Sequence, residues 1–273
     1  MEYSSTIVTN GMRLTPAIAR ELEVIHGVCA AEVTLDGPEA VHDVRRPVKN
    51  GNSSFRKIFG NLVAVANTPE IKMKLNLRCN VDSDNADDVP ELIDLLAKGG
   101  LAKRISLHFA PVYSWGNDAD ANSLTPGDFA RREVEWFAQM HNHGFGLDLL
   151  PSRQRIVCLA VHRDGELTDA LGTVFNCTEV SYVPTYGNPN RYAIGTLEQD
   201  QSAAEAPFRH FNEEILEGEH LQCESCQMLP VCGGACPKQW SEGNTPCPSS
   251  KENIVERLTL WYALQQIESG LTL

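Results

Sequence analysis

Residues 223–236 read CESCQMLPVCGGAC, and a fifth cysteine, Cys247, follows eleven residues after Cys236. The intervals C-x2-C, C-x5-C and C-x3-C bring several sulfurs into one small region, and Gly233 and Gly234 allow the tight turns that point them inward. This spacing indicates a metal site. Two chemistries are open at this point, because a structural zinc site uses one tetrahedral set of four ligands, whereas each iron–sulfur cluster takes four thiolates of its own.

Two cysteines further upstream favour iron. Cys158 and Cys177 enclose Gly172 in the pattern C-x13-G-x4-C, so that seven thiols belong to one extended motif. Seven thiols are more than one zinc ion uses and come close to the requirement of two clusters.

The seven-cysteine pattern resembles the SPASM domain, the C-terminal extension of radical S-adenosylmethionine (SAM) enzymes that mature peptides and proteins, which carries one or two auxiliary [4Fe-4S] clusters. The resemblance implies two ligand sets: Cys158, Cys177 and Cys236 for auxiliary cluster I, and Cys223, Cys226, Cys232 and Cys247 for auxiliary cluster II. Three thiolates leave one iron of cluster I open to a substrate backbone or thiol, a non-cysteine ligand or water.

The first half of the chain, residues 1–155, alternates strand and helix signals, which predicts a parallel sheet with helical crossovers. Five strands are expected, at Ser5–Thr9, Cys29–Leu35, Lys72–Val81, Arg104–Ala110 and Phe145–Leu150. Helix starts are expected at Thr15, Ser53 or Ser54, Asn85 and Thr125, and Gly99 and Gly144 are expected helix stops. The stretch Tyr113–Thr125 is either a loop that carries chemistry or a solvated connector.

Parts of this first half also look like SPASM-type radical SAM enzymes. The matching segments are Asn10-Gly11, Thr34-Leu-Asp-Gly-Pro38 with His42-Asp43 and Arg46, and Leu75-Asn-Leu-Arg78-Cys-Asn80 with Asn85. The resemblance implies an α/β fold: a partial (β/α) radical SAM barrel that lacks its first strands, followed over residues 156–273 by a small cysteine-rich α+β SPASM domain with a C-terminal helix.

The same resemblance implies that Thr34 and Arg46 contact SAM, while Arg78 either reaches the cofactor or braces the barrel. A hydroxyl at a strand end and the planar fork of an arginine suit these roles. Other readings stay open, since Asp36-Gly37-Pro38 is also an ordinary turn and Arg46 can simply pair with a carboxylate.

One family motif is missing from the sequence. Radical chemistry in the family depends on an N-terminal C-x3-C-x2-C loop that binds the SAM cluster, and here Cys29 is the only cysteine before Cys79. We therefore expect an N-terminally truncated relative that does not cleave SAM by itself and has an exposed strand edge at Ser5–Thr9. A missing N-terminal half or a dimer partner would cover that edge.

A second departure concerns the substrate. Relatives that mature sulfatases carry an Asp directly after the cysteine that matches Cys177, whereas this chain has Thr178 there and Glu179 next. The departure lowers the expectation of sulfatase maturation. It raises that of ribosomal-peptide modification, such as thioether formation from a substrate thiol bound at an open cluster iron.

Charge and composition limit the classes of binding partner and the cellular compartment that are expected. With 273 residues, a net charge of −13 and no cluster of Lys or Arg, the chain is not expected to bind nucleic acid or an anionic membrane. The sequence has no signal peptide and no long apolar run, so the reducing cytoplasm is the expected location for its nine cysteines. Cys29 and Cys79 lie outside the motif and are expected to be buried, inert core thiols.

Three functions remain as hypotheses. The first is a radical SAM/SPASM maturase of a peptide or protein, or its substrate-facing fragment, which receives electrons from a reductant such as ferredoxin or flavodoxin. The second is a non-catalytic iron–sulfur module that binds a peptide or passes electrons to a partner. The third is a zinc-stabilised binding domain.

Overall fold

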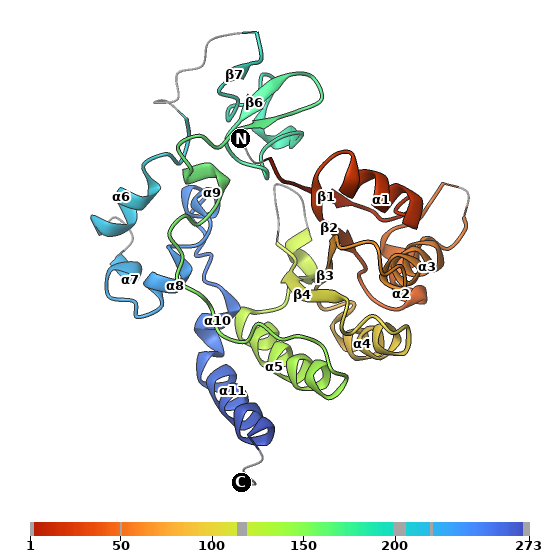
Figure 1. Ribbon diagram of the computed structural model, residues 1–273. Coiled ribbons are helices and arrows are strands. Elements are labelled where there is room, and N and C mark those ends of the chain that lie inside the picture. The colour runs from red at the N-terminus through yellow and green to blue at the C-terminus, as the bar shows by residue number, and fades with distance from the viewer. Residues whose placement is uncertain (1–2, 50, 114–118, 199–205, 219–220, 270–273) are drawn as a thin grey trace. The chain divides into compact units, whose positions relative to one another are not determined.

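The computed structural model describes residues 3–49, 51–113, 119–198, 206–218 and 221–269 (Figure 1). Residues 114–118, part of the predicted loop Tyr113–Thr125, lie outside this range. The described residues form two compact units: the first is drawn from 1–113, 119–149 and 255–273, and the second from 150–254. No described helix combines the length and the apolar character that crossing a lipid bilayer requires.

The first unit is built on a four-stranded parallel sheet in the order β1-β2-β3-β4. The strands are β1 (Ser5–Thr9), β2 (Val28–Thr34), β3 (Lys74–Val81) and β4 (Ile105–Pro111). The helices of this unit are α1 (Pro16–Val24), α2 (Glu39–Arg45), α3 (Ser54–Ala66), α4 (Val89–Lys98), α5 (Pro126–Asn142) and α11 (Ile254–Glu268). In Figure 1, α1, α3, α4 and α5 follow one another along one side of the sheet.

The two faces of the sheet differ in chemistry. Val33, Leu77 and Leu107 are register partners across β2, β3 and β4, and all three are buried. One position further along, Thr34 is opposite Arg78, which is opposite His108. Because successive side chains of a strand point to opposite faces, one face is apolar and the other carries polar groups. A parallel sheet covered on both faces would show continuous apolar runs instead.

Four of the five expected strands are present, and β1 is an edge strand with β2 as its pairing partner. The expected strand Phe145–Leu150 is wrong, since none of these residues pairs in a sheet. Phe145 and Leu149 are nevertheless buried. The alternating pattern predicted correctly which side chains point inward, but a strand also needs a hydrogen-bonding neighbour, and the described chain supplies none there.

Three of the four expected helix starts are confirmed by side-chain caps. The hydroxyls of Thr15, Ser53 and Thr125 accept hydrogen bonds from backbone N–H groups three residues ahead. Asn85 makes no such cap and precedes a short 3-10 turn, after which α4 begins at Val89. Its amide is used elsewhere, because Nδ2 donates to the carbonyl oxygens of Asp36 and Asn80.

The prediction that Cys29 is buried is wrong, whereas that for Cys79 is confirmed. In β2 the buried residues on either side of Cys29 are Val28 and Ala30, so the alternation of the strand turns Cys29 outward. Burial raises the pKa of the Cys79 thiol, which keeps it protonated and unreactive at neutral pH.

The C-terminal helix is confirmed, although it is interrupted at Asn253 between α10 (Ser249–Glu252) and α11. The near-helical spacing of Ile254, Leu258, Trp261, Tyr262 and Leu264 predicts an apolar face packed on the body, and this prediction is wrong in part, because Leu258, Trp261 and Tyr262 are exposed. Among the residues of α11 whose side chains are described, Arg257 is the buried one, and it forms an ion pair with Glu133.

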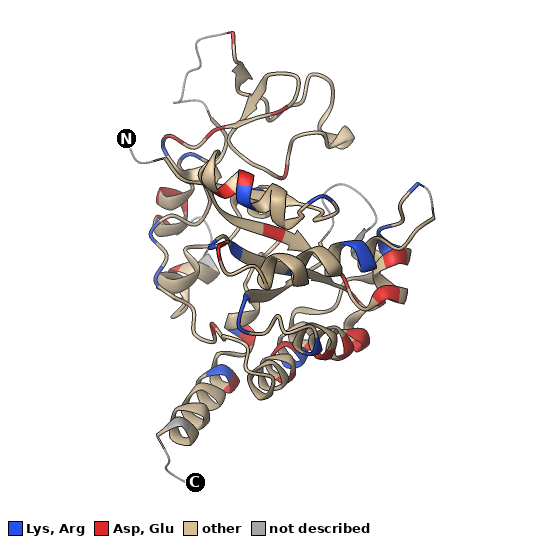
Figure 2. Cartoon of the chain, turned by 45° about the vertical axis from the view of Figure 1, so that its right-hand side comes forward, with Lys and Arg blue, Asp and Glu red and all other residues tan. Residues whose placement is uncertain are grey.

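The second unit contains a small antiparallel sheet and several short helices. The strands are β5 (Leu167–Thr168), β6 (Thr173–Phe175) and β7 (Gly195–Thr196), in the order β5-β6-β7. The helices are α6 (Phe211–Leu216), α7 (Leu221–Glu224), α8 (Leu229–Cys232), α9 (Pro237–Ser241) and α10. Figure 2 shows acidic and basic residues interspersed along the elements of the chain.

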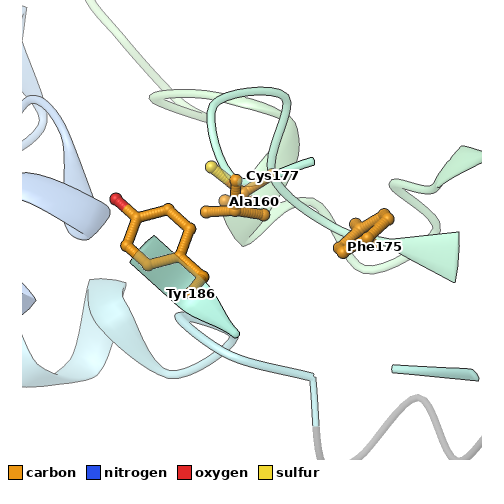
Figure 3. Close-up of a cluster of buried hydrophobic side chains, with 5 residues drawn as sticks. Ala160, Phe175, Cys177 and Tyr186 are labelled. Carbon is orange, nitrogen blue, oxygen red and sulfur yellow. The ribbon is translucent and has the colours of Figure 1, made fainter. Parts of the chain in front are cut away.

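Two apolar clusters organise this unit around motif cysteines. One contains Ala160, Phe175, Cys177, Val180 and Tyr186 (Figure 3). The other contains Val161, Phe211, Ile215 and Cys223. Elements this short bury little surface of their own, so a metal that cross-linked the segments would add directly to the stability of the fold.

Candidate metal centres

Three motif cysteines line one cavity of about 340 Å³ in the second unit. Cys158 precedes a 3-10 turn at Leu159–Val161, Cys177 follows β6, and Cys236 directly precedes α9. The sequence favours this placement of Cys236, since Pro237 occupies the first helical position, where no hydrogen bond is lost. Segments that are far apart in the chain therefore present their thiols to the same space.

Two of these thiols are held in the protonated form by their surroundings. Burial raises the pKa of Cys177 to about 11, and the neighbouring thiols of Cys236 and Cys158 act in the same direction. Burial also raises the pKa of Cys236, although backbone N–H groups of Gln239 and Lys238 partly oppose it. Metals bind the thiolate, so loading this cavity would release protons and become tighter as the pH rises.

A buried lysine lies at the wall of the same cavity. Lys238 is 1% exposed, and its Nζ lies 2.6 Å from a carboxylate oxygen of Glu242. The Tyr186 hydroxyl donates to the other oxygen of Glu242 at 2.9 Å, and the ammonium lies 5.1 Å from the centre of the Tyr186 ring. Burial lowers the pKa of Lys238, but the bonds to Glu242 and Tyr186 outweigh it and the net shift is upward. The lysine therefore stays charged next to the three thiols.

The other four motif cysteines, Cys223, Cys226, Cys232 and Cys247, line a second and much smaller pocket. Its free space is about 10 Å³, close to that of one water molecule, so a cluster would enter only if the thiol side chains moved apart. Burial raises the pKa of Cys223, and the neighbouring sulfurs of Cys232, Cys247 and Cys226 raise it further. Cys223 is thus near enough to each of the other three sulfurs to interact with it electrostatically.

Two hydrogen bonds to sulfur surround this pocket. Lys251 Nζ lies 3.3 Å from Cys247 Sγ, and the backbone N–H of Gly234 donates to Cys232 Sγ at 3.4 Å. The bond to Cys247 raises the pKa of Lys251. Both donors would stabilise negative charge on sulfur.

Within the described residues, no three Cys, His, Asp or Glu side chains are arranged to bind a single metal ion. Four sulfurs about 2.3 Å from one zinc ion would have to lie within about 4 Å of each other. In a [4Fe-4S] cluster each thiolate binds a different iron, so the sulfurs stay further apart. Seven thiols in two groups match the ligand number of two clusters better than the four ligands of one zinc ion.

The two residues expected to contact SAM lie in the first unit, near the carboxyl end of β2. Thr34 is the last residue of that strand, and its register partner is Arg78. The Arg46 side chain is 42% exposed, and its Nε donates to Asp36 Oδ2 at 2.6 Å. Carboxyl ends of parallel strands are the usual place for a site in such folds, which is the edge where these residues lie. Their contacts to SAM stay a prediction.

Asp36 is the centre of a hydrogen-bond network at this edge, a role that its place in the segment Thr34-Leu-Asp-Gly-Pro38 does not predict. Its Oδ1 accepts hydrogen bonds from the backbone N–H and from Nδ2 of Asn80, both at 3.0 Å. The backbone N–H of Asp36 donates to Nδ1 of the fully buried His42. Burial lowers the pKa of His42, so the ring is neutral at pH 7. An Asp two residues beyond a strand end is well placed to pair with arginines, as Asp36 does with Arg46.

Comparison with known proteins was made at the level of sequence and of structure. No protein-family model matches the chain, and no curated protein matches it in sequence. Native anSMEcpe with bound AdoMet, an anaerobic sulfatase-maturating enzyme of the radical SAM/SPASM type, matches at 16% identity with a TM-score of 0.67 over 100% of this chain and 77% of that one.

Two further structures of native anSMEcpe also match. One holds AdoMet and the Kp18Cys peptide (15% identity, TM-score 0.64, 95% of this chain and 76% of that one). The other holds AdoMet and the Cp18Cys peptide (16% identity, TM-score 0.64, 100% and 78%). The chain therefore has the α/β fold of this radical SAM enzyme, and the resemblance read from the sequence is confirmed at the level of the fold.

Proposed function

We propose that this chain is a radical SAM/SPASM maturase of a peptide or protein, or the substrate-facing part of one, and that it holds two auxiliary [4Fe-4S] clusters. The observation that carries the proposal is the division of the seven motif cysteines between two pockets, three in one and four in the other. That division agrees with the two ligand sets that the family resemblance implies. The fold shared with anSMEcpe, which has been solved with AdoMet and with peptides, adds independent support.

In this proposal Cys158, Cys177 and Cys236 hold cluster I, and Cys223, Cys226, Cys232 and Cys247 hold cluster II. Bound clusters supply one-electron transfer, with the potential set by charge and by hydrogen bonds to sulfur. The protein contributes thiolates from distant segments, buries Cys177 and Cys223 away from water, and places Lys238 and Lys251 beside the pockets. Thr34 and Arg46 are the proposed SAM contacts, a peptide is the proposed substrate, and ferredoxin or flavodoxin is the proposed reductant.

Iron content tests the proposal directly. Protein purified and reconstituted without oxygen should be brown and contain about eight irons per chain, as two four-iron clusters require. Cys158→Ser and Cys223→Ser should each lose about half of the iron, because each removes a ligand of a different cluster. Cys29→Ser is the matched control, since Cys29 is exposed and lies outside both pockets, and it should keep all of the iron. Colourless protein that binds zinc would refute the proposal.

A second candidate is an iron–sulfur module that binds a peptide or passes electrons but performs no radical chemistry itself. Clusters bound by the seven thiols would by themselves be sufficient for electron transfer, which supports this candidate. Reduced, cluster-loaded protein mixed with SAM separates the two: release of 5′-deoxyadenosine by the chain alone would exclude the module. No release by the chain, followed by release when a protein carrying the missing loop is added, would assign the chain to a two-part maturase.

A further inference from the structure

A third cavity in the second unit, of about 620 Å³, has not been assigned to any role above. Its apolar part is formed by Ile215, Leu229 and Pro230, and its polar part by Arg153, Gln154 and Arg155. We call it the arginine groove. The volume lies within the range of pockets that bind ligands, and the combination of an apolar floor with a few polar groups is typical of them.

The charge of the groove is opposite to that of the chain. Arg153 and Arg155 are both exposed, and within the described part of the chain neither makes an ion pair or a side-chain hydrogen bond. No Asp or Glu lines the groove, although the chain contains 36 acidic and only 23 basic residues. Two guanidinium groups without a counterion create a local positive potential that would attract carboxylates.

The backbone adds further donors. The N–H of Gln154 donates to the carbonyl oxygen of Pro230 at 3.1 Å, which fixes this segment against α8. No described backbone carbonyl accepts from the N–H groups of Arg153 or Arg155. Arg153 and Arg155 therefore have backbone donors in addition to their guanidinium groups, and a peptide has the matching carbonyl and carboxylate acceptors.

The groove adjoins the four-cysteine pocket. Leu229 lines both, and Gly233, which lines the groove, lies between Cys232 and Gly234 of that pocket. A ligand in the groove would thus lie next to the proposed cluster II ligands.

We propose that the arginine groove binds a peptide segment that carries both acidic and apolar side chains. The apolar side chains pack against Ile215, Leu229 and Pro230, and the carboxylates pair with Arg153 and Arg155. This proposal rests on the proposed function, because the peptide is taken to be part of the substrate of the maturase. It implies that this substrate carries acidic residues.

Fluorescence anisotropy tests the proposal with two labelled probes, a short peptide that alternates Glu with Leu and the same peptide with Lys in place of Glu. The cluster-loaded chain should bind the Glu peptide at least about tenfold more tightly than the Lys peptide, and added salt should weaken this binding. The double variant Arg153→Glu/Arg155→Glu should lose at least about tenfold in affinity for the Glu peptide, and Arg153→Lys/Arg155→Lys should lose less because it keeps the charge.

The matched control is Lys74→Glu/Lys103→Glu, which changes the net charge by the same amount at exposed positions of the first unit. It should bind the Glu peptide as the unchanged chain does. The proposal is refuted if this control loses as much affinity as the groove variant, or if the two probes bind equally or not at all. It is also refuted if light scattering shows a dimer that Arg153→Glu/Arg155→Glu converts to a monomer, since a second copy would then occupy the groove.

Iron content of the same samples keeps this result separate from the proposed function. Full iron with no peptide preference refutes the groove and leaves the clusters intact. A peptide preference in protein without iron–sulfur clusters refutes the proposed function and leaves the groove intact.

Discussion

Two lysines, Lys238 and Lys251, place positive charge beside the two cysteine pockets of this protein. Lys238 is buried and forms an ion pair with Glu242. The positive charge of Lys238 beside the three-thiol cavity is therefore balanced by the carboxylate. Lys251 has no such partner in the described ion pairs, and its ammonium contacts the sulfur of Cys247 directly. Removal of Lys238 would take the buried cation away from the Glu242 carboxylate, whereas removal of Lys251 would act on sulfur alone.

Lys251→Met should therefore shift the reduction potential of the proposed cluster II to a more negative value. The change removes a positive charge and an N–H···S hydrogen bond, both of which favour the reduced, more negative cluster. A potentiometric titration followed by electron paramagnetic resonance measures the shift. Lys103→Met, at an exposed position of the first unit, is the control and should leave the potential unchanged. An unchanged potential in Lys251→Met would contradict the assignment.

At the residue scale, the cysteine spacing predicted the metal-binding side chains, but it could not predict the groups that tune them. Lys238 and Lys251 follow Cys236 and Cys247 closely in sequence, yet neither belongs to a recognisable pattern. The sequence likewise does not predict the hydrogen-bond partners of Asp36. Its partners Arg46 and Asn80 come from α2's end and from β3, so the network appears only when these elements are packed together.

At the element scale, the turn between Cys232 and Cys236 sets the direction of both sulfurs. Gly233, Gly234 and Ala235 have φ values of 60°, 86° and 61°, three successive residues in the left-handed region. A Cβ added at Gly234 would lie 2.8 Å from Ile215 Cδ1 and 3.1 Å from Phe211 Cε1. The tight turn expected from the sequence is present, and its second glycine is also needed for close packing against α6.

Gly234→Ala should lower the free energy of unfolding by about 2–3 kcal/mol, because it combines an unfavourable φ with overpacking of a buried cluster. Gly243→Ala is a matched control, since Gly243 has a similar φ of 79° but open space around its Cα. It should cost only about 1 kcal/mol. Urea unfolding monitored by circular dichroism measures both. Equal losses in the two variants would show that the contact with Ile215 and Phe211 has no effect.

The strands and helix caps of the first unit were largely predictable, because they depend on local periodicity and on hydroxyl caps. The expected strand at Phe145–Leu150, which is not formed, shows the limit of prediction from local periodicity. Its inward-facing residues are buried as in a strand, but the pairing partner of a strand is a matter of tertiary structure. The exposed Trp261 and Tyr262 of α11 show the same limit for a helix, since periodicity defines an apolar face and does not supply a surface to cover it.

At the scale of the whole molecule, one buried ion pair connects the end of the chain to the first unit. Arg257 Nη2 lies 2.5 Å from Glu133 Oε2 of α5, and Arg257 Nη1 donates to the carbonyl oxygen of Leu149 at 3.2 Å. Both side chains are at least nine-tenths buried. The contact joins Arg257 to α5 within the first unit, to which residues 255–269 belong although the intervening residues 150–254 form the second.

Arg257→Met should destabilise the first unit by about 3–5 kcal/mol, because it leaves the Glu133 carboxylate buried without its cation. The double variant Arg257→Met/Glu133→Met should recover much of this loss, since two apolar side chains need no such compensation. Arg131→Met, which breaks an exposed pair with Glu135 on the same helix, should cost less than about 1 kcal/mol. The midpoints of thermal unfolding of the three variants measure these losses. Equal midpoints for Arg257→Met and Arg131→Met would contradict the role of the buried pair.

The sequence by itself determined the sulfur intervals, the caps of α1, α3 and α5, and the alternation that gives the sheet an apolar and a polar face, because each of these depends on residues close together in the chain. The tertiary structure decided that Cys158, Cys177 and Cys236 share a cavity, that Asp36 gathers Arg46 and Asn80, and that arginines 153 and 155 border an apolar groove. These groups come from separate segments. Their meeting depends on how the buried surfaces of whole elements pack, which no local pattern encodes.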